Sequence, residues 1–374
     1  MSPSAEPSLT PSTIRNVAVV GHRGCGKTSL AEAMLFRSGA IDRLGSVVNG
    51  TTVCDADDDE HRRQMTISSA LCHLRWDGTT VNVIDTPGEP SFHAETLGAL
   101  AAADTALMVV DAVDGVQVYT ERLWRRAEEM GLPRAVAVSM LDRARADMDD
   151  VMASLHALDQ RVVALQMPIG AGSALTGMVD LIDLSATTYD AEGRPTTGPV
   201  PDDVAVAAEA ARDVLIETVA STDDTLIEEY LAGEELTREE LIGALRSAVA
   251  HGALIPVVCV SAAPVPMGVE GLLDMVVQAL PSPADGPVRD AVTVDSGETL
   301  HMVPEADGPA VALCIKTLAD PFSGRVNVMR VLAGTLVGDS QVVCARTGAR
   351  ERVGRLFRLQ GKEHVPCAAL GPGD

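Results

Sequence analysis

Hydrophobic and polar positions follow two different periods along this chain, which predict strands and helices in turn. Short β-branched apolar runs at 17–20 and 80–84 predict buried strands. Segments 92–103 and 117–130 instead carry apolar residues three and four positions apart, as amphipathic helices do. Strands that alternate with helices of this length form a doubly wound parallel sheet with helices on its faces. The pattern predicts an α/β fold for the N-terminal part of the chain.

The loop between the first predicted strand and the first predicted helix is rich in glycine. It reads Gly21-His22-Arg23-Gly24-Cys25-Gly26-Lys27-Thr28-Ser29. This is a full match to the pattern G-x-x-x-x-G-K-[ST] in the strand–loop–helix context that the pattern requires. In such a loop backbone N–H groups face a di- or triphosphate, Lys27 reaches the terminal phosphates and the Thr28 hydroxyl ligates Mg²⁺. A glycine-rich turn before a lysine is the alternative, and the flanking strand and helix argue against it.

A second polar loop follows the strand 80–84 and reads Asp85-Thr86-Pro87-Gly88. A carboxylate at the C-terminal end of a neighbouring strand is where a phosphate-loop enzyme holds Mg²⁺ through water. Asp85 is therefore a candidate to hold Mg²⁺ through water, and the Gly88 N–H can face a γ-phosphate. A turn that only closes the strand is the alternative.

The segment 38–63 is rich in glycine and aspartate and predicts a loop. Its acidic run at 54–60 is expected to be solvated, as such runs usually are. Thr66 follows, where this polar loop meets a predicted strand at 67–75, so its hydroxyl is a further candidate ligand for a bound metal.

Two later strands also end in polar residues. The strand 134–138 delivers Ser139-Met140-Leu141-Asp142, and the strand 255–260 ends at Ser261-Ala262. The carboxylate of Asp142 can accept from two adjacent donors, which guanine offers at N1–H and N2–H₂ and adenine does not. A carboxylate that caps the next helix is the alternative. Because ligands of such sheets bind at the carboxyl ends of the strands, all these loops are expected to share one edge.

Charge restricts the partners that this chain attracts. Its 374 residues include 53 acidic and 29 basic side chains, which give a formal net charge of −24. This balance argues against non-specific attraction of the whole chain to nucleic acid. One dense basic stretch is the exception, and we expect it either to contact RNA phosphates or to form a solvated face. It comprises Arg346, Arg350, Arg352, Arg355, Arg358 and Lys362.

The seven cysteines are scattered and form no C-x-x-C pair. Such spacing suggests reduced thiols in a cytoplasmic protein rather than a disulfide framework or a zinc site. No apolar run is long enough to cross a bilayer, so we expect no contact with a membrane. We also expect a monomer.

Changes in pattern suggest the domain organisation. Residues 1–13 are rich in serine and proline and predict a disordered tail. A nucleotide-binding domain is expected over 14–284, interrupted by an α+β insertion at about 168–251 that contains a Pro/Gly linker at 193–201.

The remaining residues are expected to form a second domain. A linker at 285–309 leads into alternating strands at 310–374, typical of an antiparallel β-barrel. The expected strands are 310–317, 325–331, 341–345 and 350–359. They leave no room for the closing strands of a barrel, so we expect the sequence to be a fragment.

The polar loops stand in the order of a translational GTPase, and the chain resembles elongation factor G. It is most similar to the elongation-factor-G-like paralogue of actinobacteria, over nearly everything after residue 13. The segments that carry this likeness are 50–55, 141–147, 230–237 and 280–283. The resemblance implies a GTP-binding domain with an inserted subdomain, then a barrel domain, GTP or GDP and Mg²⁺ as cofactors, and the ribosome as partner.

The same resemblance implies a role for each loop. Gly21 to Ser29 would be the phosphate loop, Thr66 the switch threonine on Mg²⁺, and Asp85 and Gly88 the contacts to metal and γ-phosphate. Ser139, Met140 and Asp142 would take the base-reading position that is NKxD in the family. Ser261 and Ala262 would form the last base-binding loop.

Three departures from the family pattern concern the reaction and the base. Glu89 stands where the family has the histidine that orients the attacking water, so GTP hydrolysis is expected to be weakened. Ser139 and Met140 replace the asparagine and lysine of NKxD, which should weaken guanine binding without abolishing it. Gln64 replaces a glycine before the switch threonine.

We therefore expect a GTP-binding, ribosome-associated elongation-factor-G-like protein with slow hydrolysis, in which Lys27 and Glu89 are the candidate catalytic residues. One alternative is a fully active ribosome-stimulated GTPase of translocation or recycling. Another is a pseudo-GTPase that binds partners without catalysis.

Overall fold

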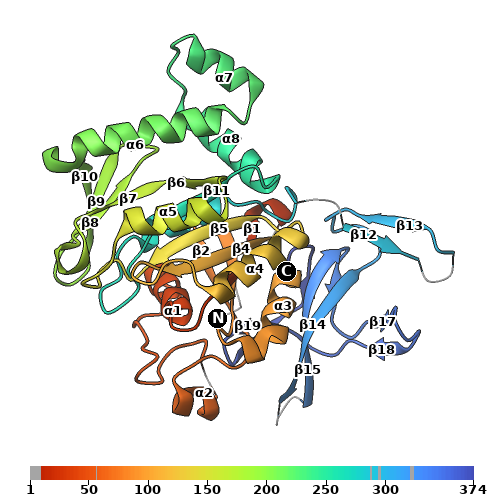
Figure 1. Cartoon of the computed structure of the whole chain (residues 1–374). Coiled ribbons are helices and arrows are strands. Elements are labelled where there is room, and N and C mark those ends of the chain that lie inside the picture. Colours follow the sequence, from red (N-terminus) through yellow and green to blue (C-terminus); the bar gives the residue numbers. More distant parts are fainter. Residues whose placement is uncertain (1–9, 56, 287–288, 294–295, 321–323) are drawn as a thin grey trace, which may run out of the picture.

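The computed structural model describes residues 10–55, 57–286, 289–293, 296–320 and 324–374. Its centre is a seven-stranded sheet with the order β2-β3-β1-β4-β5-β11-β6 (Figure 1). All neighbours pair in parallel except β2, which runs antiparallel to β3 at one edge. The strands are β1 (Ile14–Gly21), β2 (Ala70–Trp76), β3 (Thr79–Asp85), β4 (Thr105–Asp111), β5 (Arg134–Ser139), β6 (Val162–Ala164) and β11 (Ile255–Cys259).

Helices cover both faces of this sheet because its central strands are apolar on both sides. Along β1, Val17 and Val19 pack in one hydrophobic cluster with α1 and α9, while Ala18 and Val20 pack in another with α3, α4 and α5. The predicted α/β fold class is thereby confirmed. These helices are α1 (Lys27–Arg37), α3 (His93–Ala102), α4 (Val118–Glu129), α5 (Met148–Leu158) and α9 (Val269–Gln278), and 3₁₀ turns occur at Pro11–Thr13, Pro90–Phe92 and Gly172–Ala174.

An α+β unit is inserted between β6 and β11. It contains a four-stranded antiparallel sheet of order β10-β9-β8-β7, followed by three helices. The expected linker at 193–201 was wrong, because Thr196 and Thr197 pair with β9 and the prolines stand at the ends of this edge strand, where a missing N–H is tolerated. The elements are β7 (Gln166–Ile169), β8 (Gly177–Asp180), β9 (Ser185–Tyr189), β10 (Pro195–Pro199), α6 (Asp202–Ala220), α7 (Asp224–Leu231) and α8 (Arg238–Ala250).

The C-terminal region is made of antiparallel strand pairs around a small core of Val331, Leu336 and Leu356. The pairs are β14 (Val311–Asp320) with β15 (Gly324–Ala333), β16 (Leu336–Val337) with β21 (Ala369–Leu370), β17 (Gln341–Val343) with β18 (Arg350–Arg352), and β19 (Leu356–Gln360) with β20 (Glu363–Cys367). The single strand expected at 350–359 is two strands, β18 and β19, since the chain leaves the ladder at 353–355.

Three further segments that the sequence leaves without regular structure contain some in the described residues. The supposed linker 285–309 contains an exposed hairpin of β12 (Arg289–Val292) and β13 (Thr299–Met302), which buries too little to show an apolar pattern. The acidic run includes a helix, α2 (Asp58–Arg63), which begins with a capping box formed by Asp57 and Glu60. Of the expected disordered tail, residues 1–9 lie outside the described residues, and the rest includes the turn Pro11–Thr13.

Within the described part of the chain, no helix combines the length and the apolar character needed to span a membrane. The domain boundaries expected from the sequence stay a prediction.

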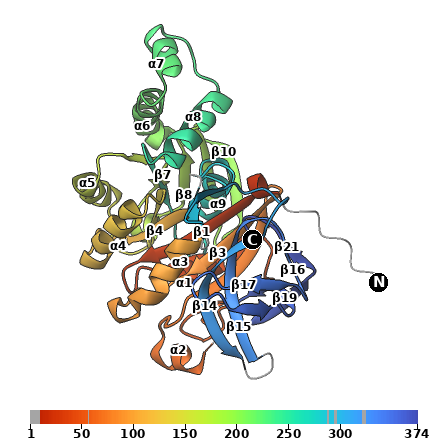
Figure 2. The same cartoon turned by 90° about the vertical axis from the view of Figure 1, so that its right-hand side faces the viewer.

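The C-terminal strand β14 lies beside α3 of the central domain (Figures 1 and 2). Ion pairs join the two regions here. Arg330 on β15 contacts both carboxylate oxygens of Asp104 at 2.9 and 3.0 Å, and both side chains are nearly fully buried. Asn16 on β1 donates to Asp104 Oδ2 at 2.8 Å and to the carbonyl of Gly373 at 3.0 Å. Nearby, Lys316 of β14 contacts Glu95 of α3 and the carbonyl of Ser69, both at 2.8 Å.

Replacing Arg330 by alanine should lower the free energy of unfolding by about 3–5 kcal/mol, because the carboxylate of Asp104 stays buried without its cation. Thermal unfolding of the variant measures this. Arg325→Ala is the matched control, because Arg325 pairs with Glu351 on the exposed surface and should cost at most about 1 kcal/mol. Equal losses in the two variants would contradict the assigned role of Arg330.

Candidate functional site

The polar loops lie together at the carboxyl edge of the central sheet. Gly21 ends β1 and Lys27 begins α1, so the glycine-rich loop connects a strand to a helix as expected. A Cβ at Gly21 would collide with the carbonyl oxygen of Val109 on β4, which leaves glycine as the residue that fits. The loop is thereby held against the neighbouring strand with its N–H groups near the start of α1.

Lys27 and Gly88 converge on this loop. The side chain of Lys27 is buried, and its Nζ donates to the carbonyl of His22 at 2.8 Å, inside the curve of the loop. A Cβ at Gly88 would collide with that Nζ and would lie 2.7 Å from the backbone N of Arg23. The backbone of Gly88 thus packs directly on the phosphate loop, where a side chain has no room.

Four side chains, from α1, the end of β3 and the segment between α1 and β2, form one polar cluster beside the loop. Thr28 Oγ1 donates to Asp85 Oδ2 at 2.7 Å, and Thr66 Oγ1 donates to Asp55 Oδ1 at 2.7 Å. The two hydroxyl oxygens lie 2.9 Å apart. The structure therefore brings the candidate ligands Thr28, Thr66 and Asp85 together, and adds Asp55, which sequence reasoning placed in a solvated loop although it is 2% exposed.

The geometry of this cluster fits Mg²⁺. Each hydroxyl has one proton, and Thr28 and Thr66 both donate theirs to a carboxylate, so their close oxygens present lone pairs to each other. Adjacent oxygen ligands of an octahedral Mg²⁺ at about 2.0–2.1 Å lie about 2.9 Å apart. In addition, Asp85 Oδ1 is buried and has no hydrogen-bond partner among the described residues.

Burial controls the charge of this cluster. Desolvation raises the pKa of Asp85 to about 7, and the negative charge of Asp55 contributes in the same direction. The pKa of Asp55 is also raised, again mainly by burial. Without a cation, a proton on Asp85 can be donated to Thr28 and frees that hydroxyl to donate to Thr66. A bound Mg²⁺ would replace this proton and favour the carboxylate.

Two buried glutamates position the segment that carries Asp55 and Thr66. Glu60 accepts from the backbone N–H groups of Asp57, Ile67 and Ser68 at 3.1, 3.0 and 3.2 Å. Glu32 of α1 accepts from Gly45 at 3.1 Å and from Val53 at 2.9 Å. Since the described residues 38–55 and 57 form no helix or strand, these side chains substitute for a backbone ladder.

The base-reading candidates lie at the same edge. Asp142 Oδ1 accepts from Ser261 Oγ at 2.8 Å, which joins the loops after β5 and β11. The alternative role of Asp142 as a helix cap is excluded, because Asp147 caps α5 by accepting from Asp149 and Asp150. Ala262 is buried next to Ser261.

Ser139 and Met140 connect the loop after β5 to the glycine-rich loop. The buried Ser139 Oγ donates to the carbonyl of Cys25 at 2.7 Å. Met140 has a left-handed backbone with φ of 61°, which is uncommon for a residue with a side chain, and its Cε approaches Gly26. A serine in this position therefore still supports the phosphate loop.

Glu89 follows Gly88 at the mouth of the site. Its carboxylate forms an ion pair with Arg23 of the phosphate loop, with 3.6 Å between Oε2 and Nη1. His22 turns a buried Nδ1 inward without a partner among the described residues.

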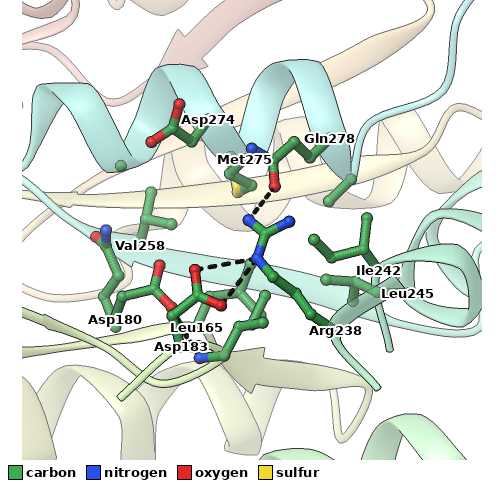
Figure 3. Close-up of a pocket in the computed structure, with 14 residues that line it drawn as sticks. Leu165, Asp180, Asp183, Arg238, Ile242, Leu245, Val258, Asp274, Met275 and Gln278 are labelled. Carbon is green, nitrogen blue, oxygen red and sulfur yellow. Dashed lines mark hydrogen bonds and ion pairs between the residues drawn. The ribbon is translucent and has the colours of Figure 1, made fainter. Parts of the chain in front are cut away.

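A separate pocket lies between the insertion and α9 and includes none of these residues (Figure 3). Its Arg238 donates to the carboxylate of Asp183 at 2.8 Å and to the side-chain oxygen of Gln278 at 2.9 Å, so the charge of Arg238 is already paired within the protein.

The doubly wound sheet, the glycine-rich loop and the carboxylate at the end of β3 define a phosphate-loop nucleotide-binding protein. Residues 12–282 match the family model described as the elongation factor Tu GTP binding domain. The chain therefore belongs to the translational GTPase family of GTP-binding domains.

A solved structure supports this assignment over nearly the whole chain. It is a crystal structure of a protein from Thermus thermophilus, with 34% sequence identity and a TM-score of 0.84. The match covers 97% of this chain and 51% of that protein, so the chain spans about half the length of the relative. The matched part of this chain includes the β-rich C-terminal region, in agreement with the predicted fold class.

Asp85→Asn should remove a pH dependence from the stability of the nucleotide-free protein in EDTA. The folded carboxyl keeps its proton up to about pH 7, against an ordinary pKa of 3.8, so the wild type loses stability as the pH rises across this window. The variant stays neutral and should not show this loss. Thermal unfolding from pH 4 to 8 measures both proteins, and parallel curves would contradict the raised pKa.

Asp142→Asn should lower the affinity for GDP by about tenfold or more, because a carboxylate that accepts from two guanine donors is lost. The affinity of the variant for xanthosine diphosphate, which has a carbonyl in place of the N2 amino group, should fall less. Competition against a fluorescent nucleotide measures both affinities. Asp147→Asn is the control, and an equal effect of the two substitutions would refute base reading by Asp142.

Proposed function

We propose that this chain is the nucleotide-binding part of an elongation-factor-G-like protein that contacts the ribosome and hydrolyses GTP slowly. The observation that best supports GTP and Mg²⁺ binding is the cluster of Thr28, Thr66, Asp55 and Asp85 beside the phosphate loop. Family membership supports guanine nucleotide as the ligand. The specific paralogue, cytoplasmic location and monomeric state are parts of the same proposal.

In this proposal each group has a separate task. The N–H groups of the loop and Lys27 bind the phosphates, while Thr28, Thr66 and Asp85 hold the metal, which neutralises phosphate charge when bound. Asp142, supported by Ser261, binds the guanine edge. The segment 14–284, with its insertion at about 168–251, would then act as one GTP-binding domain, and 310–374 would belong to a second.

Slow hydrolysis is proposed from the side chain at position 89. A neutral imidazole can accept a hydrogen bond from the attacking water without repelling the γ-phosphate, whereas a carboxylate repels it. The structure pairs Glu89 with Arg23, which turns the carboxylate toward a cation at the mouth of the loop. Both features support a reaction slower than in relatives with histidine.

Phosphate release separates this proposal from its alternatives. With GTP in excess, we expect slow release that ribosomes stimulate weakly, and Glu89→His should increase the stimulated rate. Stimulation of the wild type to the level of elongation factor G, measured in parallel, would favour a fully active GTPase. Nucleotide binding without any release in either condition would favour a pseudo-GTPase.

Contact with ribosomal RNA is proposed for part of the basic stretch. Arg352 pairs with Asp339 at 2.9 Å, Arg358 with Asp374 at 2.9 Å and Lys362 with Asp57 at 3.1 Å, which reduces the charge these residues offer. Arg346, Arg350 and Arg355 have exposed side chains and remain the better candidates.

The double substitution Arg350→Glu and Arg355→Glu should weaken co-sedimentation with ribosomes, because reversed charges repel RNA phosphates. The matched control is Arg122→Glu with Arg125→Glu, which changes the net charge equally on the exposed surface of α4. Unchanged sedimentation of the first variant would show that these two arginines do not contribute to ribosome binding.

A further inference from the structure

Arg23 and Glu89 form an ion pair where the loop after β3 meets the glycine-rich loop. Their nearest charged atoms, Nη1 and Oε2, lie 3.6 Å apart, and the side chains are 59% and 33% exposed. The pair thus faces solvent at the mouth of the site rather than forming part of the core.

The backbone explains why these two side chains meet. A Cβ at Gly88 would lie 2.7 Å from the backbone N of Arg23 and 2.8 Å from its Cα, so the loop after β3 and the phosphate loop touch at this point. The buried Lys27 Nζ also lies against Gly88 at this contact. Glu89 continues from Gly88, and its side chain reaches back across the junction to the guanidinium of Arg23.

Charge decides what this pair does to a nucleotide. An ionised Glu89 without a counter-ion would repel a nucleoside triphosphate more than a diphosphate, because the additional phosphate would lie beside Gly88. A guanidinium has five N–H donors in a planar fork and can bind a carboxylate and a phosphate oxygen together. Arg23 therefore has enough donors for both anions.

We propose that Arg23 is a γ-phosphate-binding residue that neutralises Glu89 and gives the site its affinity for the triphosphate over the diphosphate. This inference rests on the proposed function, since it requires a guanine nucleotide in the phosphate loop. It assigns to Arg23 a role beyond the backbone contact that any residue of the loop provides. It also explains how a carboxylate can follow Gly88 without excluding GTP.

The test compares a non-hydrolysable GTP analogue with GDP, both in competition with a fluorescent GDP derivative. Arg23→Ala should weaken binding of the analogue about tenfold and binding of GDP less than about twofold, because only the analogue has the third phosphate. Arg23→Lys, which keeps the charge, should show a smaller loss. Arg125→Ala, which removes an exposed arginine from α4, should leave both affinities unchanged.

A second substitution tests the coupling between the two side chains. Arg23→Ala with Glu89→Gln should recover much of the affinity for the analogue, because the uncompensated carboxylate is gone. Equal losses for both nucleotides in Arg23→Ala, or no recovery in the double variant, would overturn the role of Arg23 while GTP binding stands. Wild-type protein that binds neither nucleotide would overturn the proposed function, and this inference with it.

Discussion

The hydrogen bond between Thr28 and Asp85 is the constraint on which the site depends. The parallel register of β1 and β3 places Val19 opposite Asp85, so the end of β3 lies beside the strand that leads into the phosphate loop. Thr28 in the first turn of α1 then meets a fully buried carboxylate. A buried carboxylate is costly unless its oxygens have partners, and one oxygen of Asp85 has none among the described residues. Burial of the Asp85 carboxylate is therefore unfavourable in the absence of a cation, and a bound cation would offset this desolvation.

Other residues at this edge of the sheet position the anionic cluster or offset its negative charge. Glu60 and Glu32 bind backbone N–H groups, which keeps Asp55 and Thr66 in place without a regular strand. Lys27 and Arg23 supply positive charge on the phosphate side, although the chain as a whole carries a net charge of −24. A strongly acidic protein can therefore present a local site for a polyanion, because nearby cations and aligned N–H groups outweigh the distant carboxylates.

Sequence reasoning found the parts of the site that local pattern encodes. The glycine-rich loop, Asp85 and Asp142 all follow strands directly, and strand ends of a parallel sheet share one edge, so their proximity was predictable. Asp55 was missed because residue type alone does not distinguish a buried aspartate from the solvated aspartates next to it in an acidic run. The capping box of Asp57 and Glu60 was present in the sequence and would have indicated α2. The contact of Arg330 with Asp104 could not be predicted, because it depends on how two distant regions pack.

Calorimetric titration tests the central claim, that this edge is a site for a guanine nucleotide with its metal. GDP should bind in the presence of Mg²⁺ and bind more weakly in EDTA, since no cation then links the phosphates to the cluster around Thr28 and Asp85. ADP should bind far more weakly than GDP under both conditions. Equal binding of GDP and ADP, or binding of GDP that is indifferent to Mg²⁺, would contradict the account.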